Sequence, residues 1–201
     1  MNMKKAFFDE RAEEWDEMNP HDSKKLERIV KLLSLQVGQT VLDVGSGTGV
    51  MIPYLHRYLG EKGTIIAVDY SDKTICIAKQ KYPPREYPNV KFLLQDVNNI
   101  PLNQQYDAIL CYSCFPHFID QSITIQHLAK GLKNGGKLMI AHSESRSAIN
   151  NLHKDAGEEV SKDFLPPIEE ITKMMESAGL TVIKEIDNDE IFIIMAEQQK
   201  S

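Results

Sequence analysis

The sequence has no hydrophobic run long enough to cross a membrane. Its longest apolar runs, such as 191–196, are far shorter than the ~20 residues that a membrane-spanning helix needs. The lysines near the N-terminus are not followed by an apolar segment, so we expect no secretory signal there. These features predict a protein that is neither embedded in a membrane nor exported.

Cysteine and positive charge are both scarce. The three cysteines, Cys76, Cys111 and Cys114, are an odd number and too few for a disulfide framework, which favours the reducing cytoplasm. Lysine and arginine number 23 against 29 aspartates and glutamates, a formal net charge of −6. Nucleic acids and anionic membranes attract basic surfaces, so this balance weighs against either as a partner.

The remaining composition is that of an ordinary folded domain. Of the 201 residues, 42% are hydrophobic and 26% are charged, close to the averages for globular proteins. We find no repeat, low-complexity tract or linker. A chain of this length can bury a complete core, so we expect one domain over residues 1–201.

Short β-branched runs alternate with amphipathic stretches through most of the chain. The runs predict strands, several of them apolar on both faces as in a covered parallel sheet, at 41–44, 65–68, 90–94, 108–111 and 137–141. Ser71 and Asp120 are placed to cap two of the helices between them, the second of which is expected to end at Gly135. A third helix is expected between 166–167 and Gly179. This alternation predicts a doubly wound α/β sheet.

Both ends of the chain depart from the alternation. Before the first strand we expect one helical stretch over about 3–18, with Phe8, Ala12 and Trp15 on one side, and a second carrying Leu26, Ile29, Val30 and Leu33. After the last helix, two strand-like runs at 180–186 and 190–196 are separated by three residues only. So short a connection permits a hairpin and not a crossover, so the final pair is expected to be antiparallel.

A glycine-rich turn joins the first strand directly to a helix. It contains three glycines at alternate positions, in the sequence Asp43-Val44-Gly45-Ser46-Gly47-Thr48-Gly49. Such glycines let the backbone bend sharply and approach a ligand without interference from a Cβ atom. The N–H groups at the start of the following helix favour a carboxylate or phosphate. The turn therefore indicates a small-molecule site, and a tight turn without a ligand is the alternative.

Two further acids follow the next two strands. Asp69 ends the second strand, about 20 residues after the turn, where its carboxylate can accept both hydroxyls of a ribose. Asp96 closes the third strand and is expected at the same edge, in position for an exocyclic amine. The alternatives are a helix-capping or solvated role for Asp69 and an ordinary loop role for Asp96.

The spacing of the glycines distinguishes between cofactors. The dinucleotide fingerprint is G-x-G-x-x-G, whereas the third glycine here comes one residue early. The chain at this point resembles the class I S-adenosylmethionine-dependent methyltransferases. They share the D-x-G-x-G-x-G turn, the acids after the second and third strands, a glycine pair before the fifth strand (here Gly135 and Gly136) and the terminal hairpin. The opening residues 7–16 look like the N-terminal cap of the small-molecule branch of that family.

The resemblance implies a fold and a set of roles. The fold is a Rossmann-like seven-stranded sheet of order 3-2-1-4-5-7-6, with a helical cap (1–37), a cofactor-binding core (38–142), a lid insertion (143–167) and a final helix with the hairpin (168–201). The cofactor is S-adenosyl-L-methionine. Its expected contacts are Asp43 on the ammonium group, Gly45, Ser46, Gly47 and Gly49 on the methionine part, Asp69 on the ribose, Asp96 and Val97 on the adenine, and also Tyr70 and Cys111.

Catalytic residues are expected past the carboxyl ends of the fourth and fifth strands, where an open α/β sheet binds ligands. His117 and His142 lie there, and His153 lies in the polar insertion. Methyl transfer from a sulfonium requires alignment, exclusion of water and, for a weak nucleophile, removal of a proton. We expect His117 and His142 to line the acceptor pocket, one of them as general base, with His153 closing it. The alternative is that all three are hydrogen-bonded loop residues.

Cys111, Cys114 and His117 also have the spacing of soft metal ligands. Because Cys111 is expected to end a strand, only two of the three side chains are expected to face one site. We therefore predict no metal and regard the thiols as buried and unreactive. The predicted function is transfer of a methyl group to a small-molecule acceptor in the cytoplasm, with no membrane or nucleic-acid partner. The alternatives are an NAD-linked oxidoreductase and a non-catalytic cofactor-binding module. The acceptor and the oligomeric state are left open.

Overall fold

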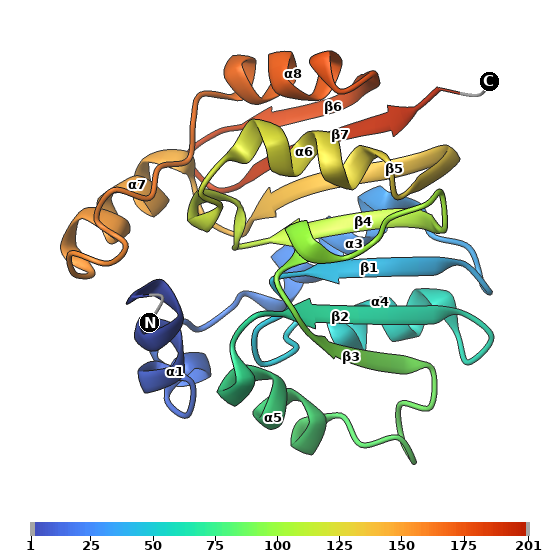
Figure 1. The fold of residues 1–201 in the computed structure, drawn as a ribbon, viewed down its shortest axis with the longest axis horizontal. Helices are drawn as coiled ribbons and strands as arrows, with labels where there is room; N and C mark the ends of the chain where they lie inside the picture. Colours follow the sequence, from blue (N-terminus) through green and yellow to red (C-terminus); the bar gives the residue numbers. More distant parts are fainter. Residues whose placement is uncertain (1–2, 200–201) are drawn as a thin grey trace. The chain divides into compact units, whose positions relative to one another are not determined.

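The computed structural model describes residues 3–199, so the outermost residues of the expected cap and hairpin segments, 1–2 and 200–201, lie outside it. The chain forms two compact units, Met1–Ile100 and Pro101–Ser201. Seven strands follow the order β3-β2-β1-β4-β5-β7-β6, which confirms the predicted Rossmann-like fold class (Figure 1). No helix within 3–199 is long and apolar enough to cross a membrane.

The first unit is built around three parallel strands. These are β1 (Thr40–Val44), β2 (Thr64–Asp69) and β3 (Val90–Leu94), with β2 pairing to both of the others. Helices α4 (Ile52–Leu59) and α5 (Asp72–Lys81) connect them, and a short 3-10 helix, η1 (Val97–Asn99), follows β3. The last four residues of β1 are buried, which explains why apolar side chains occupy both faces of the strand: a covered parallel strand has no solvent face.

Local sequence accounts for the ends of these helices. The N–H of Thr74 donates to Oγ of Ser71, 3.2 Å away, so Ser71 caps α5 as predicted. Pro53 occupies the first turn of α4, where its missing N–H costs no hydrogen bond. Helix α3 (Ser23–Leu33) buries the four residues of its predicted apolar stripe, Leu26, Ile29, Val30 and Leu33.

The N-terminal segment is not the single helix that its pattern predicts. It forms α1 (Met3–Arg11) and the short α2 (Trp15–Met18), with a turn between them. In a continuous helix, residues seven apart are separated by about 10.5 Å along the axis. The break instead brings the rings of Phe8 and Trp15 to 5.4 Å between centroids, in an edge-to-face contact. The break therefore places these two rings in the edge-to-face arrangement that aromatic pairs prefer.

The second unit contains the mixed half of the sheet. Strands β4 (Tyr106–Tyr112) and β5 (Leu132–His142) are parallel, whereas β7 (Phe192–Gln198) is antiparallel to β5 and to β6 (Leu180–Asp187). The terminal hairpin was predicted correctly. Helix α8 (Ile168–Ser177) packs against β6, β7 and α6 (Gln121–Ala129), and these elements lie together in Figure 1.

The boundary between α6 and β5 differs from the prediction. Asp120 caps α6, with its Oδ1 2.9 Å from the N–H of Ile123, but the helix ends at Ala129 rather than at Gly135. The chain turns at Gly131, and Leu132 already pairs with Tyr106 of β4. A shift of register after Tyr106 accommodates the glycine pair inside β5, where a Cβ on Gly136 would lie 3.0 Å from the Tyr106 carbonyl oxygen.

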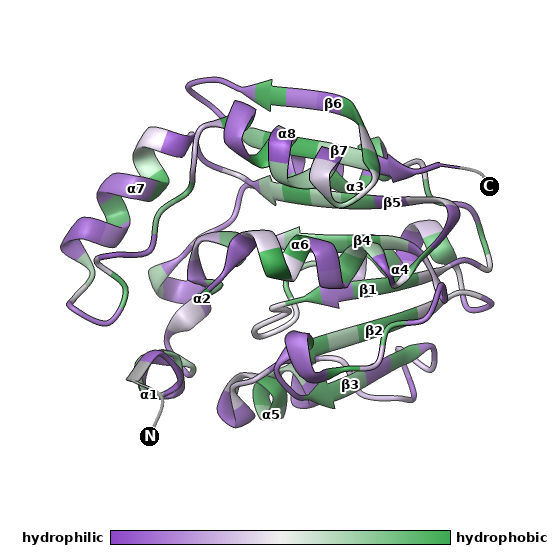
Figure 2. Ribbon diagram, turned by 45° about the horizontal axis from the view of Figure 1, so that its top comes forward, coloured by the Kyte–Doolittle hydropathy of each residue, from purple (hydrophilic) through white to green (hydrophobic). Residues whose placement is uncertain are grey.

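The expected lid insertion contains a helix that its sequence did not reveal. Helix α7 (Arg146–Asp155) is capped by Ser145, whose Oγ accepts from the N–H of Ala148 at 3.2 Å. Figure 2 shows α7 as mostly hydrophilic, with a few apolar positions. Its buried residues are Ile149, Asn150 and His153, so a polar face of this helix is turned into the protein. The role of 143–167 as a lid stays a prediction.

Candidate functional site

The glycine turn has the open backbone that the sequence predicted. Gly45, Gly47 and Gly49 all have positive φ, at 62°, 54° and 88°, a region that other residues enter only at a cost. The N–H of Ser46 donates to the carbonyl oxygen of Val68 at 3.0 Å, which ties the turn to β2. A Cβ atom on Gly47 would meet no atom within 4 Å among the described residues, so the backbone at Gly47 faces open space.

Gly49, unlike Gly47, is closely packed against neighbouring side chains. A Cβ atom there would lie 2.7 Å from the ring of Tyr82 and 2.8 Å from Cδ1 of Ile52. Gly49 thus lets the turn pack closely against two side chains, while Gly47 leaves room for a ligand. The sequence pattern treats the two glycines alike and does not distinguish these roles.

The carboxylate of Asp69 is held against the turn. Its Oδ2 accepts from the N–H of Gly47 and its Oδ1 from the N–H of Ser71, both at 2.9 Å. Burial raises the pKa of Asp69 above its ordinary value, and these two hydrogen bonds oppose the rise. The predicted proximity of Asp69 to the glycine turn is therefore present in the structure.

Asp43 lies beneath the turn, in β1, and is 1% exposed. Its Oδ2 finds no hydrogen-bond partner within the described part of the chain, and neither does the buried Oγ of Ser46. Burial, with a further contribution from the charge of Asp69, raises the pKa of Asp43 to about 8. A buried carboxylate without a partner is costly, so a positively charged group beside Asp43 would relieve it.

The N-terminal helices are bound to the turn and to α5 by polar contacts. Oδ1 of Asp16 accepts from Oγ1 of Thr48 at 2.5 Å, and its Oδ2 pairs with Nζ of Lys81 at 2.5 Å. Oδ1 of Asp9 accepts from Oγ of Ser71 at 2.6 Å. Sequence reasoning missed both acids, because nothing local to 9–16 links them to residues that follow β1 and β2.

The expected adenine contacts lie beyond β2 and β3. Asp96 is exposed and caps η1, with its Oδ1 2.9 Å from the N–H of Asn98, while Val97 is buried. Tyr70 is half-buried, and its ring makes an edge contact with Phe8 at 6.2 Å between centroids. The N-terminal segment thus reaches Tyr70 as well as the glycine turn.

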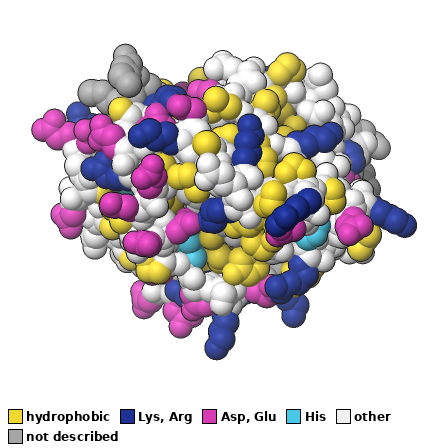
Figure 3. Space-filling model, turned by 90° about the horizontal axis from the view of Figure 1, so that it is seen from below, with side chains coloured by type: hydrophobic (Ala, Val, Ile, Leu, Met, Phe, Trp, Pro, Cys, Tyr) yellow, Lys and Arg dark blue, Asp and Glu magenta, His cyan; other side chains and the backbone are white. Residues whose placement is uncertain are grey.

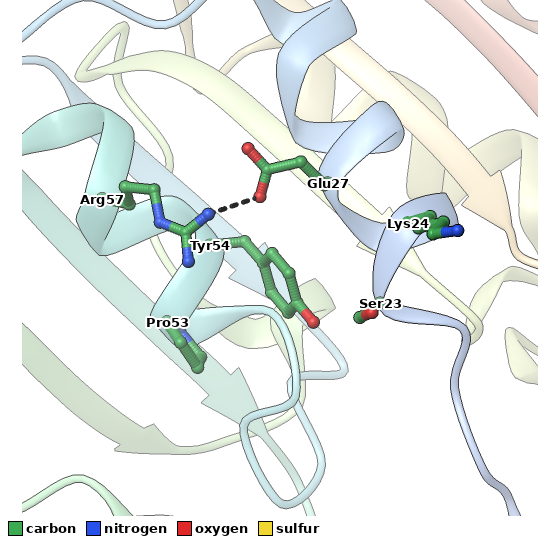
Figure 4. A pocket seen from close by; sticks show the side chains of 6 residues that line it. All are labelled: Ser23, Lys24, Glu27, Pro53, Tyr54 and Arg57. Carbon is green, nitrogen blue, oxygen red and sulfur yellow. Dashed lines mark hydrogen bonds and ion pairs between the residues drawn. The ribbon is translucent and has the colours of Figure 1, made fainter.

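The first unit also has a surface depression that is lined by other residues. It has a volume of about 650 Å³ and is lined by Ser23, Lys24, Glu27, Pro53, Tyr54 and Arg57 (Figure 4). Nη1 of Arg57 pairs with Oε2 of Glu27 at 2.9 Å, and the Tyr58 hydroxyl donates to the same carboxylate at 2.7 Å. None of the residues expected to bind the cofactor is among the six.

In the second unit, the structure brings His117 and His153 together through a residue that sequence reasoning missed. Nδ1 of His117 lies 2.6 Å from Oδ2 of Asp163, and Nδ1 of His153 lies 3.0 Å from the Asp163 carbonyl oxygen. The two imidazole rings are 4.9 Å apart between centroids. Asp163 is only 7% exposed, which is unusual for an acid outside an ion pair or hydrogen-bonded site.

His142 ends β5 and is 1% exposed. Neither of its ring nitrogens has a hydrogen-bond partner among residues 3–199. Burial lowers the pKa of His142 to about 3, with smaller contributions from the charges of His117 and His153. His142 is therefore neutral at physiological pH, and its burial makes it a poor proton acceptor.

The cysteines of this region are buried. Cys111 lies inside β4 with no exposure, and Cys114 precedes η2 (Phe115–His117). Neither forms a disulfide within the described part of the chain. The described residues contain no group of three or more histidine, cysteine or acidic side chains arranged to hold a metal ion.

The strand order, the glycine turn after β1 and the acid at the end of β2 define a Rossmann-like fold of the type that binds nucleoside cofactors. Residues 35–201 match the family model described as a methyltransferase domain, and the chain belongs to that family. S-adenosylmethionine is the cofactor of the family to which the chain is thus assigned.

Individual proteins agree with this assignment. The crystal structure of a SAM-dependent methyltransferase from Aquifex aeolicus superimposes with a TM-score of 0.73 at 25% identity, covering 94% of this chain and 97% of that one. The ubiquinone/menaquinone biosynthesis C-methyltransferase UbiE of Vibrio cholerae is 26% identical over 136 residues, or 64% of this chain and 52% of the relative. The chain therefore spans about half the length of this curated relative.

The residues present fit S-adenosylmethionine, which carries positive charge on its ammonium and sulfonium groups. Oδ2 of Asp43 is a buried carboxylate oxygen without a partner within the described residues. The open space beside Gly47 permits close approach to the backbone. Both features suit a cationic ligand that lies against the turn.

Proposed function

We propose that the protein transfers a methyl group from S-adenosylmethionine to a small-molecule acceptor. The observation that carries the proposal is the arrangement of Asp43, Gly47 and Asp69 at the ends of β1 and β2. When bound, the cofactor supplies a methyl group on a sulfonium whose sulfur leaves as a neutral thioether. The protein has to bind the two reactants, orient them and exclude water.

Roles for the cofactor-binding residues follow from their surroundings. Asp43 accepts the ammonium group, because its buried oxygen otherwise lacks a partner in the described chain. The Gly45–Gly49 turn contacts the methionine part, with Ser46 offering a second unpartnered oxygen. Asp69 binds the ribose hydroxyls. The adenine is assigned to Asp96 and Val97. The proposed cofactor-binding residues also include Tyr70 and Cys111.

The proposed acceptor site contains His117, His142 and His153. His117 is the proposed general base, because its ring is paired with a carboxylate, whereas burial holds the pKa of His142 at about 3. A small acceptor is favoured over nucleic acid by the net charge of −6. Basic and acidic side chains occur together on the face shown in Figure 3, among apolar ones. The UbiE relatives are named as C-methyltransferases of quinone biosynthesis, which favours a small molecule here too.

A cytoplasmic location is part of the proposal. Cys76 is exposed, Cys111 and Cys114 are buried, and none of them forms a disulfide among residues 3–199. Free thiols persist in a reducing compartment. We also propose that the protein acts without a membrane partner.

Calorimetry with S-adenosylhomocysteine tests the cofactor site. We expect the wild type to bind S-adenosylhomocysteine and not NAD, and Gly47→Arg to lose this binding, because the arginine side chain fills the space beside the turn. Gly38→Arg is the matched control, since Gly38 also has positive φ (90°) and open space at its Cβ but lies before β1. Undiminished affinity in Gly47→Arg, with its fold retained, would show that the ligand does not lie against the turn.

A second experiment separates an enzyme from a binding module. The protein is incubated with S-adenosylmethionine labelled on its methyl group and with the small-molecule fraction of a cell extract. We expect label to appear in a metabolite with the wild type and not with Gly47→Arg. Binding of S-adenosylhomocysteine without transfer to any metabolite would favour the non-catalytic module.

A further inference from the structure

Strand β3 lies at the edge of the sheet, and its sequence is mostly apolar. It pairs with β2 and with no other strand of the described chain, and Figure 1 shows it as the outermost strand beside β2. Four of its five residues are hydrophobic, the exception being Lys91. Leu94 is 51% exposed although its side chain is large and apolar. Natural proteins usually cover or charge such an edge, because an open apolar edge can pair with a further strand.

The open edge of β3 presents backbone hydrogen-bonding groups at alternate residues. The N–H of Gln95 donates to the Asp69 carbonyl oxygen at 2.9 Å, so Gln95 directs its N–H toward β2. Since the direction alternates along a strand, three residues of β3 direct their N–H and C=O groups away from β2, namely Val90, Phe92 and Leu94. Only the N–H of Val90 has a local acceptor, the Tyr87 carbonyl oxygen at 3.2 Å. The other outward groups have no ladder partner among residues 3–199.

The other edge strand, β6, is protected in ways that β3 is not. Its register with β7 shifts between Val182 and Lys184, and its exposed positions carry charged side chains. Bulges and charges both disfavour pairing with a further strand. β3 keeps an unbroken register with β2 over all five of its residues and has a single charge. Of the two edges, the one at β3 is therefore suited to accept a strand.

The sequence of β3 is complementary to itself when two copies run antiparallel. With Phe92 on a two-fold axis, the ring of Phe92 lies beside its counterpart in the second copy. Val90 is then opposite Leu94 of the second copy, and Lys91 is opposite Leu93 of the second copy. The outward N–H and C=O groups meet in the closely spaced pairs of an antiparallel ladder. Aromatic and aliphatic cross-strand pairs are favourable, and no lysine stands directly opposite a lysine.

Other registers use the strand less well. An axis at Lys91 would set two lysines directly opposite each other, which is unfavourable. An axis at any of the remaining three positions leaves part of the five-residue strand without its counterpart. The register centred on Phe92 is therefore the one that pairs the whole of β3 with a second β3.

We propose that β3 is a dimer interface, at which two copies of this chain pair their β3 strands antiparallel about a two-fold axis at Phe92. Such an interface uses the same surface on both copies, so the assembly closes at two. Because the paired segments are short, the interface is smaller than that of a permanent dimer, and we expect dissociation at micromolar concentrations. None of the residues proposed to bind cofactor or acceptor lies in β3, so the inference is independent of methyl transfer.

Sedimentation velocity of the full chain over about 1–200 µM, under reducing conditions, measures this association. We expect a monomer–dimer equilibrium for the wild type. Leu94→Lys should raise the dissociation constant by about tenfold or more, because it places an unpaired charge beside Val90 of the second copy. Circular dichroism checks that the variant folds. Ile183→Lys is the matched control, since Ile183 is 45% exposed in β6, and it should leave the dissociation constant unchanged.

Disulfide formation tests the register, in proteins that carry Cys76→Ser because Cys76 is exposed. In the double variant Val90→Cys/Leu94→Cys, the two positions face each other across the axis with Cα atoms about 5.5 Å apart, within the range of a disulfide. We expect oxidation to link two chains. Leu94→Cys alone should stay unlinked although position 94 is well exposed, because the two copies of this position lie roughly 14 Å apart along the ladder.

A wild type that stays monomeric up to about 200 µM would overturn the proposal and leave this edge to a strand of a different protein. A dimer that is unaffected by Leu94→Lys, or is weakened equally by Ile183→Lys, would also overturn it, because the copies would then meet elsewhere. If Leu94→Cys links chains as readily as the double variant, the antiparallel register is wrong. Should Leu94→Lys fail to fold, the cross-linking result decides.

Discussion

Asp43 and Asp69 lie on neighbouring parallel strands, and the negative charge of Asp69 adds to burial in raising the pKa of Asp43 to about 8. Asp69 has two backbone N–H donors, whereas Oδ2 of Asp43 has no partner among the described residues. The two carboxylates therefore differ in what a ligand can offer them. Asp43 would gain most from a positively charged group on the ligand. Asp69 already accepts two backbone hydrogen bonds, so it needs less from a ligand.

The first prediction is that the cofactor site releases protons on binding. With a pKa of about 8, Asp43 is mostly protonated at pH 7, and a ligand ammonium beside it favours the ionised form. We expect S-adenosylmethionine to release up to about one proton per site at pH 7 and fewer at pH 9. Calorimetry in two buffers of different ionisation enthalpy measures this number.

Asp43→Asn is the control for proton release, since it removes the titrating group and keeps the size of the side chain. It should bind more weakly and with the same enthalpy in both buffers. Equal enthalpies with the wild-type protein would contradict the assignment of the ammonium to Asp43.

The second prediction concerns the stability of the protein without cofactor. Because the pKa of Asp43 is higher in the folded than in the unfolded chain, its contribution to stability is fully present below about pH 4 and is lost as pH rises to about 8. Asp43→Asn does not titrate, so it should be more stable than the wild type at pH 8.5, on the order of a few kcal/mol. Urea unfolding at pH 4.5 and pH 8.5 tests this. A larger advantage for Asp43→Asn at pH 4.5 would reverse the sign and refute it.

Features set by local pattern could be predicted from the sequence. The strands, the caps at Ser71 and Asp120 and the antiparallel hairpin depend on residues close together in the chain, and the structure confirms them. The end of α6 was predicted wrongly because Leu132 fits an apolar helix face as well as a buried strand. Pairing with Tyr106 decides between the two, and that partner lies far from Leu132 in the sequence.

The parts of the candidate site that the sequence did not reveal depend on long-range contacts. Asp163 lies 46 residues from His117, and Asp16 lies 32 residues from Thr48. Neither acid differs from a solvated surface residue in its local pattern. Asp163 is distinguished as a candidate site residue by its burial, and the composition of a polar segment does not show which of its residues are buried. The break between α1 and α2 likewise accompanies ring contacts of Phe8, one of which is with the distant Tyr70.

The third prediction concerns the contact between the N-terminal helices and the glycine turn. Burial alone would raise the pKa of Asp16, but hydrogen bonds from Lys81 and Thr48 hold it below its ordinary value. Asp16→Ala removes both contacts. Because the ion pair of Asp16 with Lys81 is partly exposed, we expect its removal to cost about 1 kcal/mol of stabilisation of the N-terminal helices. We expect faster amide hydrogen exchange over residues 3–18 and about fivefold weaker binding of S-adenosylhomocysteine.

Glu17→Ala is the matched control for Asp16→Ala, because Glu17 is an exposed acid of the same short helix. It should leave hydrogen exchange and affinity as in the wild type. If Asp16→Ala and Glu17→Ala behave alike, the contact of Asp16 with Thr48 and Lys81 does not hold the N-terminal segment in place.

The fourth prediction separates the two glycines that the sequence pattern treats alike. Gly47→Ala meets no neighbour, so its cost is mainly the positive φ of 54°, about 1 kcal/mol. Gly49→Ala adds contacts of 2.7 Å and 2.8 Å with Tyr82 and Ile52 to a φ of 88°, which brings the cost to roughly 2–4 kcal/mol. Thermal unfolding should therefore rank Gly49→Ala below Gly47→Ala.

Binding should show the opposite ranking once stability is taken into account. Below its unfolding temperature, Gly47→Ala places a methyl group in the space that the cofactor is proposed to occupy, whereas the methyl group of Gly49→Ala points into Tyr82. We therefore expect that, for each kcal/mol of stability lost, Gly47→Ala loses more affinity for S-adenosylhomocysteine than Gly49→Ala does. The double variant Gly49→Ala/Tyr82→Leu relieves the contact with the ring and should recover part of the stability, because the steric cause is then removed. If Gly49→Ala lost the greater affinity at matched folded fractions, the open space at Gly47 would not be the place where the ligand lies.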